Sequence, residues 1–263
     1  MNNTIFKQTW QQMHEQPLIS IVSIVGTALS LFLIMLVVMI KQVTVAPFAP
    51  ESNRDRMLYV KFASIGSPDG ESNCPWSISS VNTIYKSMKT PQAVSAYTSF
   101  PSRMPLSVDE TKAFNADVKL TDAAFWKIFD FSFIDGKPYD EAAYKAGIAA
   151  AVIDRTTARK LFGTDTGVAG RTFSLGHTSV KVAGVVSDVS TLASAAYAQV
   201  WLPLTVEKEG LNETTMNGIG GIFSVVILAR QKSDLKKVHD EAVANVNKFN
   251  LAIKKEGMKL INR

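Results

Sequence analysis

The stretch of residues 18–40 constrains the chain more than any other, because it consists of apolar and small residues and contains no charged side chain. At a rise of about 1.5 Å per residue, a helix over this stretch is roughly 35 Å long. The hydrocarbon core of a bilayer is about 30 Å thick, so the helix can cross it with some tilt. We therefore predict one membrane-spanning helix over residues 18–42, with a short tail on one side of the membrane and a large domain on the other.

A cleaved signal peptide is the alternative explanation of this stretch. The apolar region of a signal peptide is only about 7–15 residues long and follows a clearly basic segment. Here the preceding segment carries Lys7, which Glu15 balances, and the nearest small-residue cleavage site, at Ala46, is followed by Pro47. We therefore expect the helix to be retained.

The tail, residues 1–17, is expected to form an amphipathic helix in the membrane interface. Its apolar residues recur mostly three or four positions apart; they are Ile5, Phe6, Trp10, Met13 and Pro17. Trp10 is expected at headgroup level, and Pro17 is expected to separate a helix along the membrane from one across it. A frayed polar leader is the alternative.

Charge near the span leaves its orientation open. The positive-inside rule counts Lys and Arg close to the ends of a membrane helix. The tail offers Lys7, whereas the other side offers Lys41, Arg54 and Arg56. This count alone does not favour a cytoplasmic N-terminus.

The rest of the chain predicts an α+β domain with a mixed sheet and packed helices. Apolar residues make up 46% of the 263 residues, enough for a hydrophobic core beyond the span. We expect a polar connector over residues 43–56 and a folded domain over residues 57–263, with room for two subdomains. The net charge of +5 comes from scattered Lys and Arg, and no basic patch with interleaved aromatic residues occurs, which argues against nucleic-acid binding.

Hydrophobic periodicity places the elements of this domain. Strands are expected at residues 57–62, 94–100, 114–120, 148–153, 180–187, 199–204 and 222–229. Helices are expected at residues 77–89, 125–129, 155–162 and 233–255. Glycine and proline predict a loop over residues 64–75 and a long mobile loop marked by Gly210, Gly218, Gly220 and Gly221.

The clearest strand pattern is at residues 114–120, where apolar residues alternate with Asn115, Asp117 and Lys119. The alternation predicts one buried face and one face in water. The expected helix caps are Ser77, Thr121 or Asp122, Asp154, Ser233 and, after helix 155–162, Gly163.

Catalytic motifs are absent from the sequence. No nucleophile elbow, Walker phosphate loop or dinucleotide fingerprint occurs. The histidines lie far apart without the spacing of metal ligands, and Cys74 is the only cysteine, which excludes an intramolecular disulfide. Asp188 is the best lone polar candidate, and a turn or cap role is its simpler explanation. We therefore expect no enzyme activity, no cofactor and no metal site.

Residues 149–188 carry a recognisable pattern. They read AAVIDRTTARKLFG, then VAGRTFSLG after a connector, then VKVAGVVSDV. With the aromatic helix and the glycine before it, this run resembles the periplasmic core domain of MacB/FtsX-type ABC transporter permeases. The residues on the family positions are Phe125, Phe129, Gly136, Ala158, Leu161, Phe162, Gly163, Gly170, Val182, Gly184, Val185 and Asp188. The tail, Pro17 and the span are similar to the family's start as well.

The resemblance implies a permease subunit without catalytic residues of its own. Such permeases have a cytoplasmic N-terminus and an extracytoplasmic core domain, form dimers, and work with a separate ABC ATPase. They export lipoproteins, peptides, toxins or antibiotics, or control a periplasmic or outer-membrane partner. The expected location is the bacterial inner membrane, in contact with lipid and with a single pass in this chain. The family pattern includes three more spans that this sequence lacks, so we expect a fragment or a member reduced to its first half.

The residues expected to couple the span to the ATPase are Phe6, Trp10, Met13 and Pro17. A sensor with one membrane helix and an outer ligand-binding domain is the main alternative function. An anchored hydrolase is a third, and it requires a concave site that groups residues such as His177 and Asp188.

Overall fold

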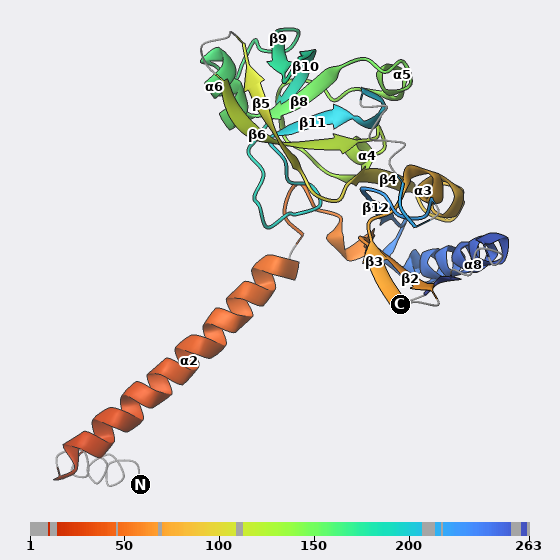
Figure 1. Cartoon of the computed structure of the whole chain (residues 1–263). Coiled ribbons are helices and arrows are strands. Elements are labelled where there is room, and N and C mark those ends of the chain that lie inside the picture. The colour runs from red at the N-terminus through yellow and green to blue at the C-terminus, as the bar shows by residue number, and fades with distance from the viewer. Residues whose placement is uncertain are drawn as a thin grey trace. The chain divides into compact units, whose positions relative to one another are not determined.

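The computed structural model describes residues 10, 15–45, 47–67, 70–108, 113–206, 214–216, 218–253 and 259–261 (Figure 1). The chain divides into two compact units, Met1–Ala46 and Pro47–Arg263. In the first unit, the long helix α2 runs over Pro17–Val45 and confirms the helix that the sequence predicts. Pro17 is its first residue, a position that suits proline because the first N–H of a helix has no intrahelical partner.

The second unit is built on a 10-stranded sheet. Its strands are β1 (Met57–Val60), β4 (Ala93–Thr98), β5 (Ser102–Ser107), β6 (Ala113–Thr121), β7 (Phe133–Gly136), β8 (Ala150–Asp154), β9 (Thr172–Leu175), β10 (Thr178–Val186), β11 (Val200–Pro203) and β12 (Phe223–Leu228). The strand order is β1-β12-β4-β6-β11-β8-β10-β9-β5, with β7 beside β10. The pairs β6–β11 and β8–β10 are parallel, and the other pairs are antiparallel, so the predicted mixed sheet is confirmed.

Part of this sheet closes on itself. β5 pairs with β6 on one side and with β9 on the other, so β6, β11, β8, β10, β9 and β5 form a closed ring of strands. The short helices α4 (Phe125–Ile128), α5 (Glu141–Lys145) and α6 (Arg155–Phe162) belong to the same stretch of chain. We call residues 102–204 the ring segment.

The remaining strands form an open extension of the ring, which we call the flank. Its strands β4, β12 and β1 follow one another outward from β6. Its helices are α3 (Ile78–Ile84) and α8 (Leu235–Ile253), which contact each other. A separate 3-stranded sheet contains β13 (Lys259–Leu260), β2 (Ala63–Ser67) and β3 (Gly70–Cys74).

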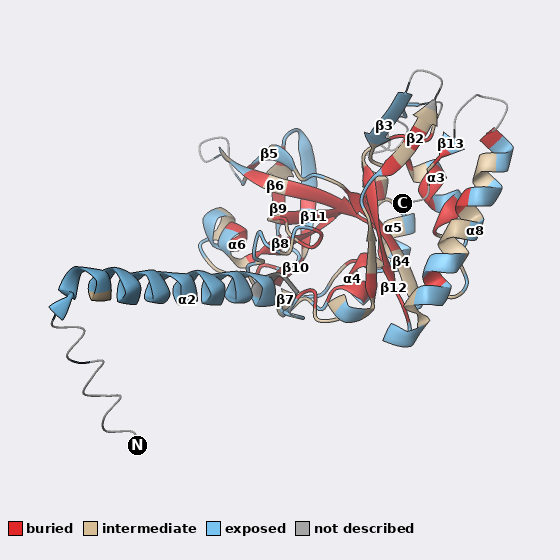
Figure 2. Ribbon diagram, turned by 90° about the horizontal axis from the view of Figure 1, so that it is seen from below, coloured by how far each residue is buried: buried red, intermediate tan, exposed pale blue. Residues whose placement is uncertain are grey.

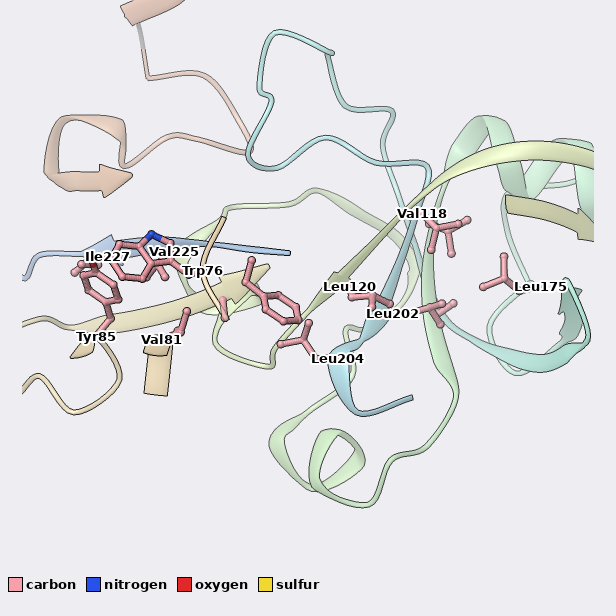
Figure 3. Close-up of a cluster of buried hydrophobic side chains, with 14 of the residues drawn as sticks. Trp76, Val81, Tyr85, Val118, Leu120, Leu175, Leu202, Leu204, Val225 and Ile227 are labelled. Atoms are coloured by element: carbon pink, nitrogen blue, oxygen red, sulfur yellow. The ribbon is translucent and has the colours of Figure 1, made fainter. Parts of the chain in front are cut away.

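The larger of two hydrophobic core clusters runs through both parts of the second unit. Figure 2 shows buried residues along the strands and on the inner side of α8, whereas α2 is exposed almost throughout. In Figure 3 the core extends from Trp76, Tyr85 and Ile227 in the flank to Leu120, Leu202 and Leu175 in the ring segment. The predicted apolar stripe of the last helix takes part, since Val238, Val246 and Ile253 are buried.

The predicted loop at residues 64–75 is wrong, because β2 and β3 form a hairpin there. Ala63 and Ile65 alternate with more exposed residues and are both 1% exposed, and β13 pairs with the other edge of β2. Gly66 and Pro75 suggested a loop, but β2 pairs with the neighbouring β3, and β13 from the far end of the chain pairs with its other edge. Local sequence contains β3 but not β13, which completes the small sheet.

Lys119 contradicts the prediction that one face of strand 114–120 lies in water. Its side chain is 0% exposed. It lies on the outer face of β6, which is covered by residues 188–198, since its ammonium group donates to the carbonyls of Ser194 and Ala195. The alternation is real, but both faces of the C-terminal half of β6 are covered.

Two predicted helices have different ends. The helix expected over residues 77–89 stops at Ile84, because Tyr85 ends its last turn and the Lys86 N–H turns back to the Val81 carbonyl. The predicted cap Ser77 is confirmed: its hydroxyl accepts from the Ser80 N–H. Ser233 is not the cap of the last helix, since it lies inside the short 3-10 turn Lys232–Asp234 before α8.

The loop predicted as mobile is packed where it is described. Ile219 is 0% exposed, and its carbonyl accepts from the Ser77 N–H at 2.9 Å. Gly221 approaches Trp76 and Ser77 so closely that a Cβ there would lie 2.7 Å from the Ser77 Cα. Gly210 lies outside the described residues.

Candidate functional site

The candidate membrane span in α2 is the first element of interest. Pro17–Gln42 is long and apolar enough to cross a membrane, and none of the most apolar part is buried in the chain. Three of its hydroxyls bond inside the helix: those of Ser20, Thr27 and Ser30 donate to the carbonyls four residues earlier at 3.0, 2.6 and 2.8 Å. A helix that satisfies such polar groups internally and exposes mainly apolar surface is suited to lipid or to other membrane helices.

The predicted coupling residues lie at the start of this unit. Trp10 is helical and its side chain is 59% exposed, and Pro17 begins α2. Phe6 and Met13 lie outside the described residues, as does most of the predicted amphipathic helix. These residues remain predictions.

The family-pattern residues after β8 build one compact corner. The Asp154 carboxylate accepts from the Thr157 N–H at 2.7 Å, as a helix cap does, and Gly163 ends α6 with a φ of 76°. Ala158 is fully buried, whereas Leu161 and Phe162 are half-buried against the core. The predicted cap, helix and terminator are confirmed, and their role is to position α6 on the ring.

Two glycines of the pattern allow β7 and β10 to approach closely. Gly136 pairs with Gly184 across these strands. A Cβ on Gly184 would lie 2.9 Å from the Lys137 carbonyl oxygen, and a Cβ on Gly136 would overlap the Ala183 carbonyl oxygen. The predicted close approach at Gly184 is confirmed, and β10 also has a bulge beside it in its pairing with β8.

Sequence reasoning missed Asp135, which lies in β7 next to Gly136. Its carboxylate accepts from the N–H groups of Val168 and Ala169 at 2.6 and 2.9 Å. Both bonds lower the pKa of Asp135, and the bond from the Ala169 N–H contributes most to this shift. Gly170 follows with a φ of 92°, so the pattern glycine belongs to a turn that this carboxylate fixes.

Phe125 in α4 and Phe129 directly after it belong to an aromatic cluster on the outer face of the ring. Their ring centroids are 4.6 Å apart, and both side chains are buried. Trp126 and Phe131 join the cluster and reach Trp201 of β11, whose indole N–H donates to the Ala196 carbonyl at 3.0 Å. The cluster attaches α4 and residues 188–198 to the sheet.

Asp188 takes the structural role rather than a catalytic one. Its carboxylate accepts from the Thr156 N–H in the first turn of α6 at 2.9 Å. His177 lies before β10 and Asp188 after it, so a strand of nearly 30 Å separates them. The structure therefore does not bring together the pair that an anchored hydrolase would need.

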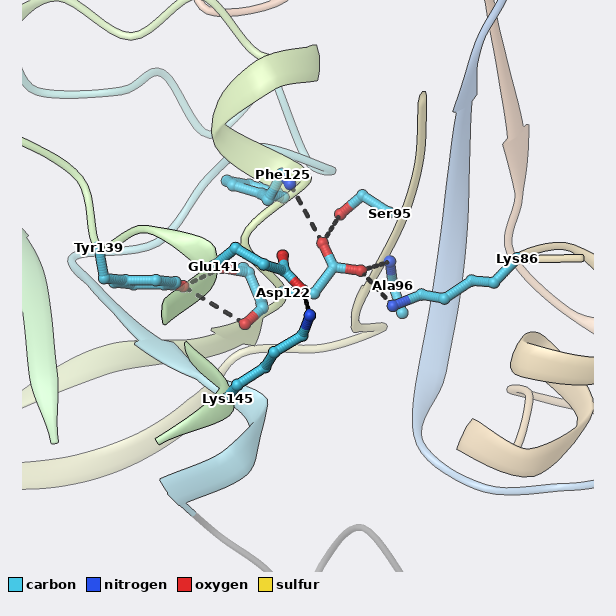
Figure 4. Close-up of polar contacts among 9 residues, drawn as sticks. Lys86, Ser95, Ala96, Asp122, Phe125, Tyr139, Glu141 and Lys145 are labelled. Atoms are coloured by element: carbon cyan, nitrogen blue, oxygen red, sulfur yellow. Dashed lines mark hydrogen bonds and ion pairs between the residues drawn. The ribbon is translucent and has the colours of Figure 1, made fainter. Parts of the chain in front are cut away.

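Asp122, directly after β6, is a buried carboxylate with four partners (Figure 4). One carboxylate oxygen accepts from the Ser95 hydroxyl at 2.7 Å and the Phe125 N–H at 3.1 Å. The other accepts from the Ala96 N–H at 2.9 Å and pairs with the Lys86 ammonium at 2.7 Å. Since Asp122 is 2% exposed, it is a buried link between α4, strand β4 and the chain after α3.

Lys119, in β6 three residues before Asp122, is a second buried ionisable residue. Its ammonium nitrogen lies 2.9 Å from the Ser194 carbonyl, 2.8 Å from the Ala195 carbonyl and 5.2 Å from the centre of the Tyr97 ring. Burial lowers the pKa of Lys119 to about 7, against the opposing effect of the Glu51 carboxylate. This lysine holds residues 194–195 against the sheet.

Metal or thiol chemistry has no visible site in the described part of the chain. No group of three or more potential metal ligands occurs there. Burial raises the pKa of the Cys74 thiol above its usual value, which works against a reactive thiolate.

These features define a class of protein: an α+β domain with a mixed sheet, preceded in the chain by a long apolar helix. Residues 20–245 match the family model of the MacB-like periplasmic core domain. The chain therefore belongs to this family, which is a non-catalytic component of ABC transporter permeases, and the recognition from residues 149–188 is confirmed.

Solved structures share the fold. The extracellular domain of the noncanonic ABC-type transporter YknZ from Gram-positive bacteria is 16% identical with a TM-score of 0.55, over 78% of this chain and 100% of that one. The periplasmic region of MacB from Actinobacillus actinomycetemcomitans is 16% identical with a TM-score of 0.52, over 77% and 88%. No match is found among curated protein sequences.

Proposed function

We propose that the chain is a permease subunit, or the N-terminal part of one, of an ABC transporter. In this proposal a separate ATPase hydrolyses ATP, and the chain passes the resulting movement to the extracytoplasmic side to drive export. The observation that carries the proposal is the family match across residues 20–245, which includes most of the span as well as the outer domain.

The proposed topology places the N-terminus in the cytoplasm and the outer domain in the periplasm, with α2 in the inner membrane. The proposed boundaries are residues 1–17 for the interfacial helix, 18–42 for the span, 43–56 for the connector and 57–263 for the outer domain. A permease dimer and a periplasmic or outer-membrane partner complete the assembly.

The proposed coupling requires that both α2 and the outer domain be stiff. A helix transmits a displacement only if it is continuous and if a firm body receives it. α2 has no proline after Pro17, and Gly26 is its one glycine. The outer domain offers a closed ring whose strands have no free edge within it, together with the buried Asp122 link.

Trp10→Ala tests the proposal. In the reconstituted complex of ATPase and permease, we expect the variant to keep ATP turnover and to lose most of the transport or partner activation that turnover drives. Gln12→Ala, on the predicted polar side of the same tail, is the matched control and should behave like the wild type. Unchanged transport by the Trp10 variant at equal expression would contradict the coupling role.

The sensor alternative makes a different prediction in the same system. If the chain is a sensor, adding it to the same ATPase in the reconstituted system should leave the rate of ATP hydrolysis unchanged. Stimulation of ATP turnover by the wild-type chain therefore separates the two functions.

A further inference from the structure

The second unit contains a hollow that none of the preceding roles uses. It has a volume of about 330 Å³ and lies where the flank meets the ring segment. Its walls come from the chain after β1, from the turn between β4 and β5, from the start of β12 and from residues 191–197. Ligand sites of this size are commonly found where two parts of a protein meet.

The apolar side of the hollow is formed by exposed aromatic rings. Phe62 is 45% exposed and Phe100 is 67% exposed, and their ring centroids are 6.2 Å apart. Pro101 and the buried Tyr97 continue this surface. Large aromatic side chains left in water beside a hollow are a favourable contact surface for an apolar ring or branched chain.

The polar side of the hollow carries a single sign of charge. Among its described lining residues, Lys61 is the one charged residue, and its side chain is exposed. The hydroxyls of Ser99 and Ser224 lie 2.8 Å apart, and Ser224 donates to the Lys61 carbonyl at 3.1 Å. These hydroxyls hold the chain in place next to the lysine.

The neighbouring carboxylates are already engaged. Glu51 lines an adjacent hollow that shares Lys61, and it is paired with Arg54. Asp117 accepts from the Tyr197 hydroxyl at 3.1 Å. The carbonyls of Ser194 and Ala195 are directed at Lys119, which does not line the hollow. Neither carboxylate is among the described lining residues, so the charge on the lining itself is positive.

We propose that this hollow binds a small amphipathic carboxylate, with its aromatic or branched apolar body against Phe62, Phe100 and Pro101 and its carboxylate beside Lys61. The volume accommodates one compact ring system, and the lone cation selects an anion over its neutral analogue. This binding goes beyond the proposed coupling function and does not depend on it. It needs neither the ATPase nor transport.

Two probes that differ only at the charged group test the proposal. Naphthalene-1-acetate has an apolar ring system and a carboxylate, and naphthalene-1-acetamide replaces the carboxylate by a neutral amide. Each is titrated by calorimetry into the full chain in lipid nanodiscs, and the heat of empty nanodiscs is subtracted. We expect saturable binding of both probes at one site, with the carboxylate binding more tightly.

Substitutions at the rim separate the charge from the apolar contact. Lys61→Gln should weaken binding of naphthalene-1-acetate about threefold to fivefold, the effect of a solvent-exposed ion pair, and leave the amide unchanged. Lys248→Gln, an exposed lysine on α8, is the matched control and should change neither probe. Phe100→Ala should weaken both probes about tenfold, because the lost ring surface contributes equally to each.

Three results would overturn the proposal. The first is no saturable binding of naphthalene-1-acetate by the wild type. The second is an equal loss in the Lys61 and Lys248 variants, which would indicate general charge attraction. The third is unchanged binding in the Phe100 variant. This variant should fold like the wild type, because the ring that it loses is exposed. Because no arm measures ATP turnover, failure here leaves the coupling proposal untouched.

Discussion

The ring segment and the flank share strand β6 but hold it in different ways. β5 pairs with β6 along its length, from Ser102↔Val118 to Ser107↔Ala113, and β11 pairs with the other edge. β4 of the flank pairs with β6 at Tyr97↔Thr121 and is joined further by polar side chains. Backbone pairing thus closes the ring, whereas buried side chains and the common core attach the flank.

This difference matters for a domain proposed to transmit movement. A closed ring changes shape only by breaking strand pairs, so it moves as a body. A junction made by one strand pair, a buried carboxylate and apolar packing can adjust at lower cost. The following variants test the two kinds of attachment, from the largest expected effect to the smallest.

Asp122→Ala should break the junction. The variant removes the buried carboxylate that accepts from the Ser95 hydroxyl, from two N–H groups and from the Lys86 ammonium. Because these donors lose their acceptor, we expect the free energy of unfolding to fall by about 3 kcal/mol. Chemical denaturation of the detergent-solubilised chain measures it. Asp140→Ala removes an exposed helix cap and should cost about 1 kcal/mol. Equal losses in the two variants would contradict a special role of Asp122.

Gly184→Ala should strain the ring itself. The added Cβ would lie within 3.0 Å of the Lys137 backbone nitrogen and the Phe133 ring, so overpacking should cost about 2 kcal/mol. Gly66→Ala is the matched control, because its Cβ would meet its nearest neighbour at an ordinary 3.5 Å. The same denaturation experiment compares them, and a Gly184 variant as stable as the Gly66 variant would disprove the close approach.

Lys119→Met should change how stability depends on pH. Since the pKa of Lys119 falls from 10.5 in the unfolded chain to about 7 in the folded one, the unfolded state binds more protons between these values. Wild-type stability should therefore rise with pH from about 7 to 10, by at most about 1.4 kcal/mol per pH unit, relative to the Met variant. Melting temperatures of both proteins across this range measure the difference. Parallel pH profiles would show that the buried amine does not titrate there.

Asp188→Ala should have the smallest effect. Its carboxylate supports one exposed N–H at the start of α6, so we expect a loss of about 0.5–1 kcal/mol. Asp154→Ala, at the buried cap of the same helix, should cost about 1–2 kcal/mol. Thermal unfolding ranks the pair, and a larger loss at Asp188 would reverse the assigned roles.

Prediction from the sequence succeeded where the deciding contacts are local. The Asp154 cap, the α6 helix and the Gly163 terminator are formed by residues within a few positions of one another. The close approach at Gly184 was readable because a glycine inside an apolar strand is costly without a packing reason. The family pattern in residues 149–188 combines these local features, and the family match confirms it.

Prediction failed where the partner is distant in the chain. Lys119 was expected in water because its neighbours in β6 alternate, and residues 194–195, which bury it, come some 75 positions later. The β2–β3 hairpin was missed for a different reason: its strands are neighbours in the chain, but their glycine and proline residues favoured a loop, and only the third strand, β13, is distant. The four partners of Asp122 come from three separate segments, so cap chemistry revealed only its bond to Phe125.

By itself the sequence determined the apolar helix of residues 18–40, the caps Ser77, Asp154 and Gly163, and the family to which the chain belongs. Each depends on hydrophobic length or on interactions between close neighbours, which residue order alone specifies. Only the tertiary structure decided that β5 returns to close the ring, that Lys119 and Asp122 are buried, and that Phe62 and Phe100 meet beside Lys61. Those outcomes depend on which distant strands pair, because burial and electrostatic environment are properties of the assembled sheet.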